Sequence, residues 1–250
     1  MIQKTYTFIV PSWLGISAIL VLLNMGVNQK AIANTTSQNI SGVIVSQAQL
    51  TAEQWLKRGD ERENAKDAIA DYTQAIKLKP DYADAYLRRA TIRHIIQKDY
   101  AGAIADYDRA IKLRPQPKDM SVYSNSGNAH AALGDYKGAI AKYTASLKID
   151  PNGLFIFFLY NDRGLSYLAL GDTKSAIADF NQAIKLDPES AVSYYNRGLA
   201  QRRLGQKQAA ISDFQKAAKL YQANNKTEEY QRTLNQLKEL QSTTSTPSQK

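Results

Sequence analysis

Residues 160–188 read YNDRGLSYLALGDTKSAIADFNQAIKLDP, and this stretch decides the fold. Its apolar and small residues recur every three or four positions, as they do in amphipathic helices. The pair Gly171 and Asp172 divides the stretch in two, and Pro188 closes it. Glycine accepts the left-handed conformation that ends a helix, and proline cannot continue one because it lacks an N–H group. The stretch therefore predicts two short helices joined by a tight turn.

The same unit occurs five times along the chain. The second helix of each copy carries a small residue, an aromatic residue four positions later and a small residue three positions after that. These positions share one face of a helix, where small residues allow a neighbouring helix to approach. The aromatic residues are Tyr72, Tyr107, Tyr143, Phe180 and Phe214. The first four copies end at Pro80, Pro115, Pro151 and Pro188. This period of roughly 35 residues is typical of a helical solenoid.

The first helix of each copy completes the pattern. It places an aromatic residue four positions before a glycine, as at Tyr160 and Gly164, or before an alanine in the second copy, at Tyr86 and Ala90. The full succession of aromatic, glycine, aromatic, alanine, aromatic, alanine and proline resembles the signature of the tetratricopeptide repeat (TPR) family. Five copies in phase run from about residue 51 to 221. The resemblance implies an all-α fold, a right-handed superhelical solenoid of about five helix–turn–helix units.

The repeats set the expected domain boundaries. We expect repeats at about residues 51–80, 81–115, 116–151, 152–188 and 189–222, and a capping helix at 227–241. The TPR domain then spans 51–241, with a flexible linker at 34–50 and a disordered tail at 242–250. The first copy is shortened between Gly59 and Ala68, which predicts a truncated first helix or a loop. The second copy has an extra residue before Ala103.

Residues 1–33 lie outside the repeats and have the layout of an export signal. Lys4 gives a positive start, an apolar stretch follows, and the tripeptide AIA at 31–33 offers the small residues that signal peptidase reads. Cleavage there would leave Asn34 as the new N-terminus. The alternative is a retained membrane anchor over residues 8–27, about the length that a membrane helix needs. We expect the repeats to be exported to a periplasm or lumen-like compartment, or to be membrane-anchored.

Composition excludes several classes of site. The chain has 250 residues, no cysteine and a formal charge of +9. The lack of cysteine excludes disulfides, thiolate metal sites and a lipidated cysteine. A basic balance can indicate nucleic acid or an anionic membrane surface, but here a lysine recurs near the end of each second helix, where a cation complements the helix dipole. These lysines are Lys77, Lys112, Lys148, Lys185 and Lys219. We therefore expect no nucleic-acid partner.

The sequence contains no motif of catalytic, cofactor or metal chemistry. Its histidines, His94 and His130, show no ligand spacing with carboxylates, and His130 takes the repeat's buried aromatic position. The glycines occur singly and form no phosphate-binding loop. The second helices carry recurring carboxylates at Asp71, Asp106, Asp179 and Asp213, for which one occurrence per repeat indicates a structural or solubility role. We expect no enzyme activity, no cofactor and no metal.

The family resemblance implies that the first helices line a concave groove in which peptides or helices of partners bind. The candidate residues beside the packing glycines are Arg88, Ser124, Asn125, Asn128, Asn161, Asp162, Tyr195 and Asn196. Asparagines can donate to and accept from a peptide backbone, and Arg88, Arg202 and Arg203 could pair with acidic groups. A carboxylate clamp is not expected, because Leu87, Ser124, Asn161 and Tyr195 stand where such a clamp has lysine.

The segment Leu154–Tyr160, LFIFFLY, is more apolar than one helix face can bury. One interpretation is an exposed apolar patch at Phe155, Phe157 and Phe158, because such patches mark contacts with partners or membranes. The other is local packing over the third repeat.

Three functions fit these observations. The first is a non-enzymatic protein–protein interaction scaffold, exported or membrane-tethered, which captures a peptide or helix of a partner in the groove and acts in the assembly of an envelope or membrane complex. The second is a regulatory or accessory subunit of an enzyme complex. The third is a basic surface that binds anionic lipid.

Overall fold

The computed structural model describes residues 50–114, 120–151, 153 and 156–242. The expected export signal or anchor at 1–33, most of the linker at 34–50 and almost all of the expected tail lie outside these residues, as does Phe155. The repeats belong to one compact unit that begins at Ala52. Among the described helices, none is both long enough and apolar enough to cross a membrane.

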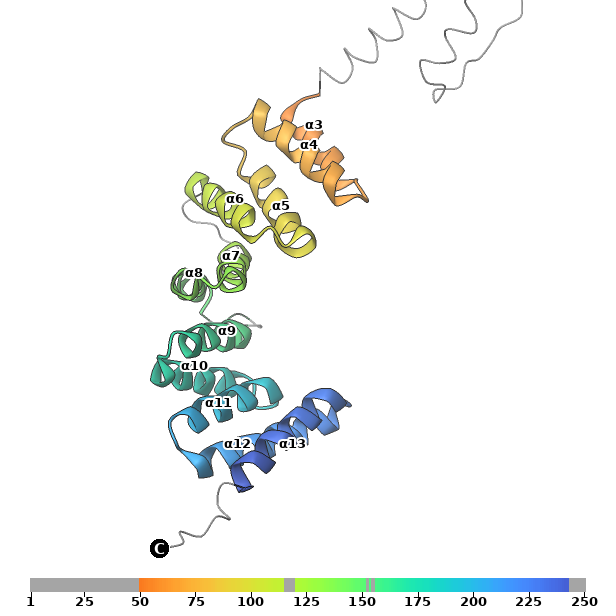
Figure 1. Ribbon diagram of the computed structural model, residues 1–250. Coiled ribbons are helices and arrows are strands. Elements are labelled where there is room, and N and C mark those ends of the chain that lie inside the picture. Colours follow the sequence, from red (N-terminus) through yellow and green to blue (C-terminus); the bar gives the residue numbers. More distant parts are fainter. Residues whose placement is uncertain (1–49, 115–119, 152, 154–155, 243–250) are drawn as a thin grey trace, which may run out of the picture. The chain divides into compact units, whose positions relative to one another are not determined.

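The described residues form helices and no strand, and the helices follow one another in pairs (Figure 1). The pairs are α3 (Ala52–Asp60) with α4 (Ala65–Leu78), α5 (Ala83–Ile92) with α6 (Tyr100–Leu113), α7 (Ser121–Leu133) with α8 (Tyr136–Ile149), α9 (Ile156–Ala169) with α10 (Thr173–Leu186), and α11 (Ala191–Arg203) with α12 (Lys207–Ala223). A π-helix, η1 (Arg93–Gln97), extends α5, and α13 (Thr227–Ser242) follows the last pair. Each helix packs against its neighbours in sequence, which confirms the predicted all-α repeat solenoid.

The two helices of a repeat approach closely because a glycine of the first faces an aromatic ring of the second. A Cβ atom added at Gly127 would lie 2.6 Å from Cε1 of Tyr143, and one added at Gly164 would lie 2.7 Å from Cε1 of Phe180. Both distances are well inside the separation at which carbon atoms attract. The rings of Tyr143 and Phe180 are buried. The glycine–aromatic spacing in the sequence therefore marks a close contact between helices.

Two repeats depart from this pattern at the turn between their helices. In the first repeat α3 ends at Asp60, so the first helix is truncated, as its shortened sequence predicts. In the second repeat the extra residue widens the last turn into η1, which is followed by Lys98 with a φ of 56°. A π-turn takes up an inserted residue within a helix. The helix pairing therefore continues unchanged beyond it.

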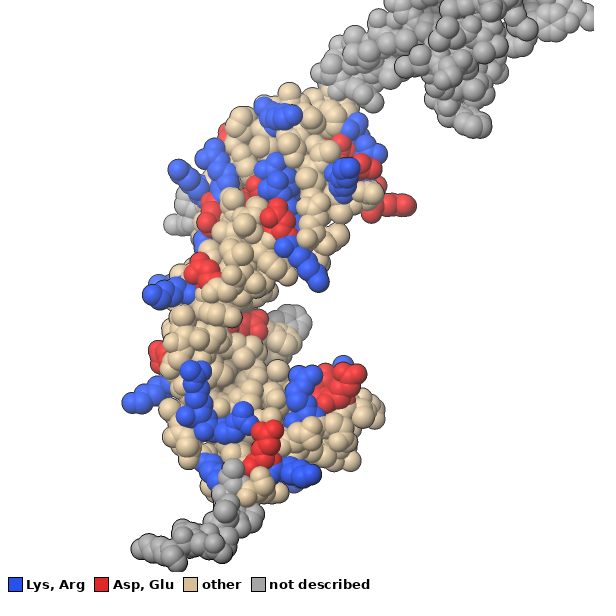
Figure 2. Space-filling model, viewed as in Figure 1, with Lys and Arg blue, Asp and Glu red and all other residues tan. Residues whose placement is uncertain are grey.

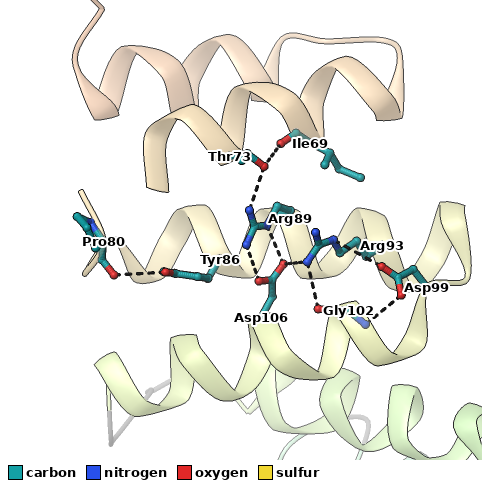
Figure 3. A network of polar contacts seen from close by, with 9 residues as sticks. All are labelled: Ile69, Thr73, Pro80, Tyr86, Arg89, Arg93, Asp99, Gly102 and Asp106. Carbon is teal, nitrogen blue, oxygen red and sulfur yellow. Dashed lines mark hydrogen bonds and ion pairs between the residues drawn. The ribbon is translucent and has the colours of Figure 1, made fainter. Parts of the chain in front are cut away.

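A buried ion pair joins the two helices in four of the five repeats. An arginine directly before the packing position donates two hydrogen bonds to an aspartate of the second helix. The pairs are Arg58–Asp71, Arg89–Asp106, Arg163–Asp179 and Arg197–Asp213. In the second repeat the bonds measure 2.8 and 2.7 Å, and Arg93 adds a bond of 2.7 Å to Asp106 (Figure 3). Such bidentate pairs fix geometry as well as supply energy, so these recurring aspartates are structural.

The same arginines connect successive repeats. Nη1 of Arg89 donates to Oγ1 of Thr73 on α4 at 2.9 Å (Figure 3). Nη1 of Arg163 donates to Oγ1 of Thr144 on α8, also at 2.9 Å. Each guanidinium therefore bonds its own repeat and the one before it. The sequence carried a signal for this role, since an arginine recurs directly before the packing position, but we did not predict it.

The third repeat replaces both members of the ion pair. Ser126 takes the place of the arginine and Lys142 that of the aspartate. Oγ of Ser126 is buried without a hydrogen-bond partner among the described residues. Lys142 instead forms an ion pair with Asp108 on α6. The two changes together avoid a buried unpaired charge, and they keep an ion pair between the second and third repeats.

The last helix covers the apolar end of the repeats. Leu237 and Leu240 of α13 are each 9% exposed and pack with Phe214 of α12. Arg202 of α11 hydrogen bonds Gln236 and Glu239 of α13. The predicted C-terminal capping helix is therefore confirmed.

Candidate partner-binding groove

Two of the predicted groove residues line one pocket between α5 and α7. The pocket has a volume of about 450 Å³. Its walls include Leu87, Arg88 and Thr91 of α5, Val122 and Asn125 of α7, and Tyr107 of α6. Asp84 and Ser121 also line it, so polar and apolar side chains contribute about equally to its walls. The pocket lies between the first helices of two successive repeats, where the family resemblance places partner binding.

The charged residues beside this pocket already have partners within the chain. Nε of Arg88 lies 3.3 Å from Oδ1 of Asp60, although the Arg88 side chain is still 54% exposed. Asp84 accepts two hydrogen bonds of 2.8 Å from the guanidinium of Arg114. Exposed ion pairs of this kind are weak. Arg88 can therefore exchange its partner for an acidic group of a ligand at little cost.

Three predicted groove residues, Ser124, Asn125 and Asn128, lie on α7. Asn125 is half-buried and lines the pocket. Oδ1 of Asn128 accepts a hydrogen bond of 2.7 Å from the Tyr143 hydroxyl. Burial raises the pKa of that hydroxyl, and the charge of Asp162 raises it further. The Ser124 hydroxyl donates to the carbonyl of Ser121 within the same helix.

Asn161 and Asn196 bind each other instead of facing outward. Nδ2 of Asn196 donates to Oδ1 of Asn161 at 2.9 Å, and the two residues are only 6% and 4% exposed. The pair joins α11 to α9 across the repeat boundary. Tyr195 is half-buried, with its ring 5.6 Å from that of Phe214. Of these three predicted groove residues, the two asparagines are therefore buried, and their side chains bond each other instead of facing a partner.

Asp162 lies beside this asparagine pair and lacks a cation. Among the described residues, no lysine or arginine forms an ion pair with its carboxylate. Its hydrogen bond comes from Nδ2 of Asn161, at a long 3.4 Å. Burial raises the pKa of the Asp162 carboxyl, an effect that this bond only partly offsets. The helix thus holds a partly desolvated negative charge among neutral neighbours.

Two arginines predicted to be available to a partner, Arg202 and Arg203, bond other helices of the chain. Arg202 bonds α13, as described above. Nη1 of Arg203 donates to the carbonyl of Leu168 on α9 at 2.8 Å. We had expected both arginines to be available for acidic groups of a partner. Arg202 instead joins α11 to the capping helix α13, and Arg203 joins α11 to α9.

The predicted apolar patch is partly exposed. Phe158 is 47% exposed, and Phe157 is half-buried with its ring centroid 4.0 Å from that of Phe158. Ile156 and Leu159 of the same segment are buried against Tyr143. Both interpretations of the segment therefore hold for different residues, with local packing on one side of α9 and exposure at Phe158.

Both histidines contact side chains of the repeats themselves. Nδ1 of His130 lies 2.8 Å from Oδ2 of Asp135, the residue that caps α8. His94 lies edge-on to the rings of Tyr100 and Tyr107, and burial lowers its pKa. The described residues contain no cluster of histidines and carboxylates that could hold a metal ion.

Comparison with known proteins points to one family. Family models described as tetratricopeptide repeats match residues 60–116, 97–153 and 191–224, and a TPR repeat model matches residues 164–205. No curated protein matches the chain.

Solved structures share the fold at low sequence identity. The chain is similar to MamA, with 20% identity and a TM-score of 0.63 over 70% of this chain and 94% of that one. It is similar to YrrB, with 17% identity and a TM-score of 0.61 over 68% and 86% of the two chains. It is also similar to PilF of Pseudomonas aeruginosa, with 15% identity and a TM-score of 0.54 over 76% and 91%. Repeat pattern, helix packing and family models agree, and the chain belongs to the tetratricopeptide repeat family.

Proposed function

We propose that this protein is a non-enzymatic interaction scaffold that captures a peptide or helix of a partner protein on its first helices. The observation that carries the proposal is the pocket between α5 and α7, which is lined by Arg88 and Asn125. YrrB, which has the same fold, is described as a TPR protein with an unusual peptide-binding site. Capture would combine apolar anchors with hydrogen bonds to the partner's backbone.

The charge distribution supports protein binding over binding to an anionic lipid surface. On the face shown in Figure 2, lysines and arginines are interspersed with aspartates and glutamates. A surface that binds anionic membranes needs cations gathered in one area. The cations nearest the pocket, Arg88 and Arg114, are paired with carboxylates.

Export is part of the proposal. Residues 1–33 have the layout of a signal, and they direct the repeats across a membrane or anchor them to it. The scaffold would then act in assembly of an envelope or membrane complex. N-terminal sequencing of the protein purified from its host tests this step. A chain that starts at Asn34, or an intact chain in the membrane fraction, supports export or anchoring, and an intact chain outside the membrane overturns both.

Site-specific photo-crosslinking tests capture on the first helices. A photoreactive residue replaces Asn125 in one variant and Ala141, which is exposed on the second helix α8, in a matched control. We expect a partner protein to be cross-linked through position 125 and not through 141. A third variant combines the probe at 125 with Thr91→Arg, which fills the pocket and should abolish the adduct. Equal labelling at 125 and 141, or none at 125, contradicts the proposal.

A further inference from the structure

The first helix of the fourth repeat, α9, carries a carboxylate between two exposed apolar side chains. Phe158, Asp162 and Leu165 follow one another at helical spacing on α9, so they lie on one face of that helix. Phe158 is 47% and Leu165 39% exposed, while Val192 at the start of α11 is 36% exposed. We call the residues Phe158, Asp162 and Leu165 the α9 stripe. It presents one carboxylate between two exposed apolar side chains.

The charge of the α9 stripe is not neutralised within the described part of the chain. Arg163, the next residue, points its guanidinium at Asp179 with bonds of 2.8 Å. Arg202 and Arg203 of α11 are bonded to α13 and to the Leu168 carbonyl. The nearby polar groups Asn161 and Asn196 are neutral and bonded to each other. Arg163, Arg202 and Arg203 are thus bonded to other groups, as is Arg197 of α11, which bonds Asp213.

We propose that the α9 stripe binds a partner segment that places a lysine or arginine on Asp162 and apolar residues on Phe158 and Leu165. This inference rests on the proposed scaffold function and specifies the chemistry of its partner. An acidic segment or a C-terminal carboxylate is disfavoured there, because like charges repel in a partly desolvated setting.

Both parts of a basic side chain match this surface. Lysine and arginine lay an apolar stem along apolar surface and keep the charge at its end. The stem would contact Phe158 or Leu165 while the cation reaches Asp162. A cation over an aromatic ring gains further attraction. Burial raises the pKa of Asp162, so an incoming cation restores interactions that desolvation removed.

A random peptide library displayed on phage tests the proposal with the full-length protein as target. We expect the selected peptides to be enriched in lysine or arginine flanked by apolar residues. A synthetic copy of a selected peptide should bind at least about tenfold more weakly to Asp162→Asn, because a hydrogen bond to a charged group is lost. Asp81→Asn removes an exposed aspartate outside the stripe and should leave the affinity unchanged.

Two further measurements separate this inference from the proposed function. A Leu165→Glu variant disrupts the stripe by charge and shape, and should abolish binding of the same peptide. Replacing the peptide's basic residue with glutamine should weaken binding to wild type and not to Asp162→Asn. Selected peptides that bind the stripe without a basic residue, or that are acidic, overturn the inference and leave the scaffold function standing. A library that yields no peptide sensitive to any first-helix variant contradicts both.

Discussion

We expect the ionised Asp162 side chain to lower the stability of the folded protein at neutral pH. Its pKa is raised by burial, and its hydrogen bond from Asn161 is long. A carboxyl whose folded-state pKa lies above the unfolded value destabilises the fold above that pKa, and stability returns as the pH falls through it. We therefore expect Asp162→Asn to raise the melting temperature at neutral pH, and the gain over wild type to shrink in acid.

Thermal unfolding followed by circular dichroism at several pH values measures this difference. Tyr143, whose pKa Asp162 influences, stays neutral over the range because its own pKa is raised. Asp81→Asn serves as the control, because it removes the same charge at an exposed position. A variant that is less stable than wild type at neutral pH would show that the Asp162 charge is compensated. A partner's cation would remove the same penalty on binding, which links stability to function at this residue.

The Asp106 carboxylate makes the opposite contribution. It is 4% exposed and accepts bonds from Arg89 and Arg93. Asp106→Asn leaves these guanidinium groups without their negative partner, and breaking a buried pair from one side is strongly destabilising. We expect a loss of about 3 kcal/mol in the free energy of unfolding. Urea denaturation measures it, with the exposed Asp108→Asn as the comparison, and a loss below that of the comparison would contradict the buried-pair role.

The candidate groove was only partly predictable at the level of single residues. Helical spacing placed Asn161, Asp162 and Asn196 near one surface, and the structure brings them together. Spacing could not show that the two asparagines bind each other, because that contact joins neighbouring repeats. It also could not show which charges are paired. Which charges are paired depends on contacts between repeats, such as the bonds of Arg202 to α13 and of Arg203 to α9.

At the scale of the helix, capping residues vary among repeats. Asp99, Asp135 and Asp172 each accept a hydrogen bond from a backbone amide in the first turn of the helix that follows. Gln206 stands at the same place before α12 and makes no such side-chain bond. Aspartate is among the best N-cap residues, since it satisfies an otherwise unpaired amide and complements the helix dipole.

We expect Gln206→Asp to stabilise the protein by about 1 kcal/mol. The reverse change in the fourth repeat, Asp172→Gln, should destabilise it by a similar amount, because the Asp172 side chain caps α10 through its bond to the amide of Ser175. Paired urea titrations of the two variants measure both effects. The glycine before Gln206 has the same left-handed conformation as those before Asp135 and Asp172, so an aspartate at 206 can cap α12, and no gain from Gln206→Asp would contradict this prediction.

The sequence predicts where the helices of each repeat lie, but it does not predict local changes in their geometry such as η1. The repeat marks both helices of every unit, and each one is observed. The extra residue before Ala103 was visible as a length difference, and either a longer loop or a wider turn could have absorbed it. The structure uses the wider turn, η1, which ends at Gln97 and keeps contact with α6. Packing contacts, which the local pattern does not encode, decide between such alternatives.

At the scale of the molecule, stability depends on contacts between neighbouring helices. Each repeat contacts mainly the repeats on either side, so an end can unfold while the middle stays folded. The C-terminal end is covered by α13, with Leu237 packed on Phe214. The cap also holds Arg202 of α11, the helix that carries Asn196 and Val192. The cap therefore supports α11, which is joined to α9, the helix of the α9 stripe, by the Asn161–Asn196 hydrogen bond.

We expect Leu237→Ala to loosen the C-terminal repeats selectively. Truncation of a buried leucine typically costs about 2–5 kcal/mol, and in a solenoid this loss falls first on the adjoining repeat. Hydrogen exchange should show reduced protection in α11, α12 and α13 and unchanged protection in α6 and α7. The exposed Leu133→Ala is the control and should change neither region. Uniform loss of protection from α3 to α13 would show instead that the repeats unfold as one cooperative unit. Selective loosening should also weaken peptide binding at the α9 stripe while leaving the pocket between α5 and α7 intact, because α9, which carries the stripe, contacts α11.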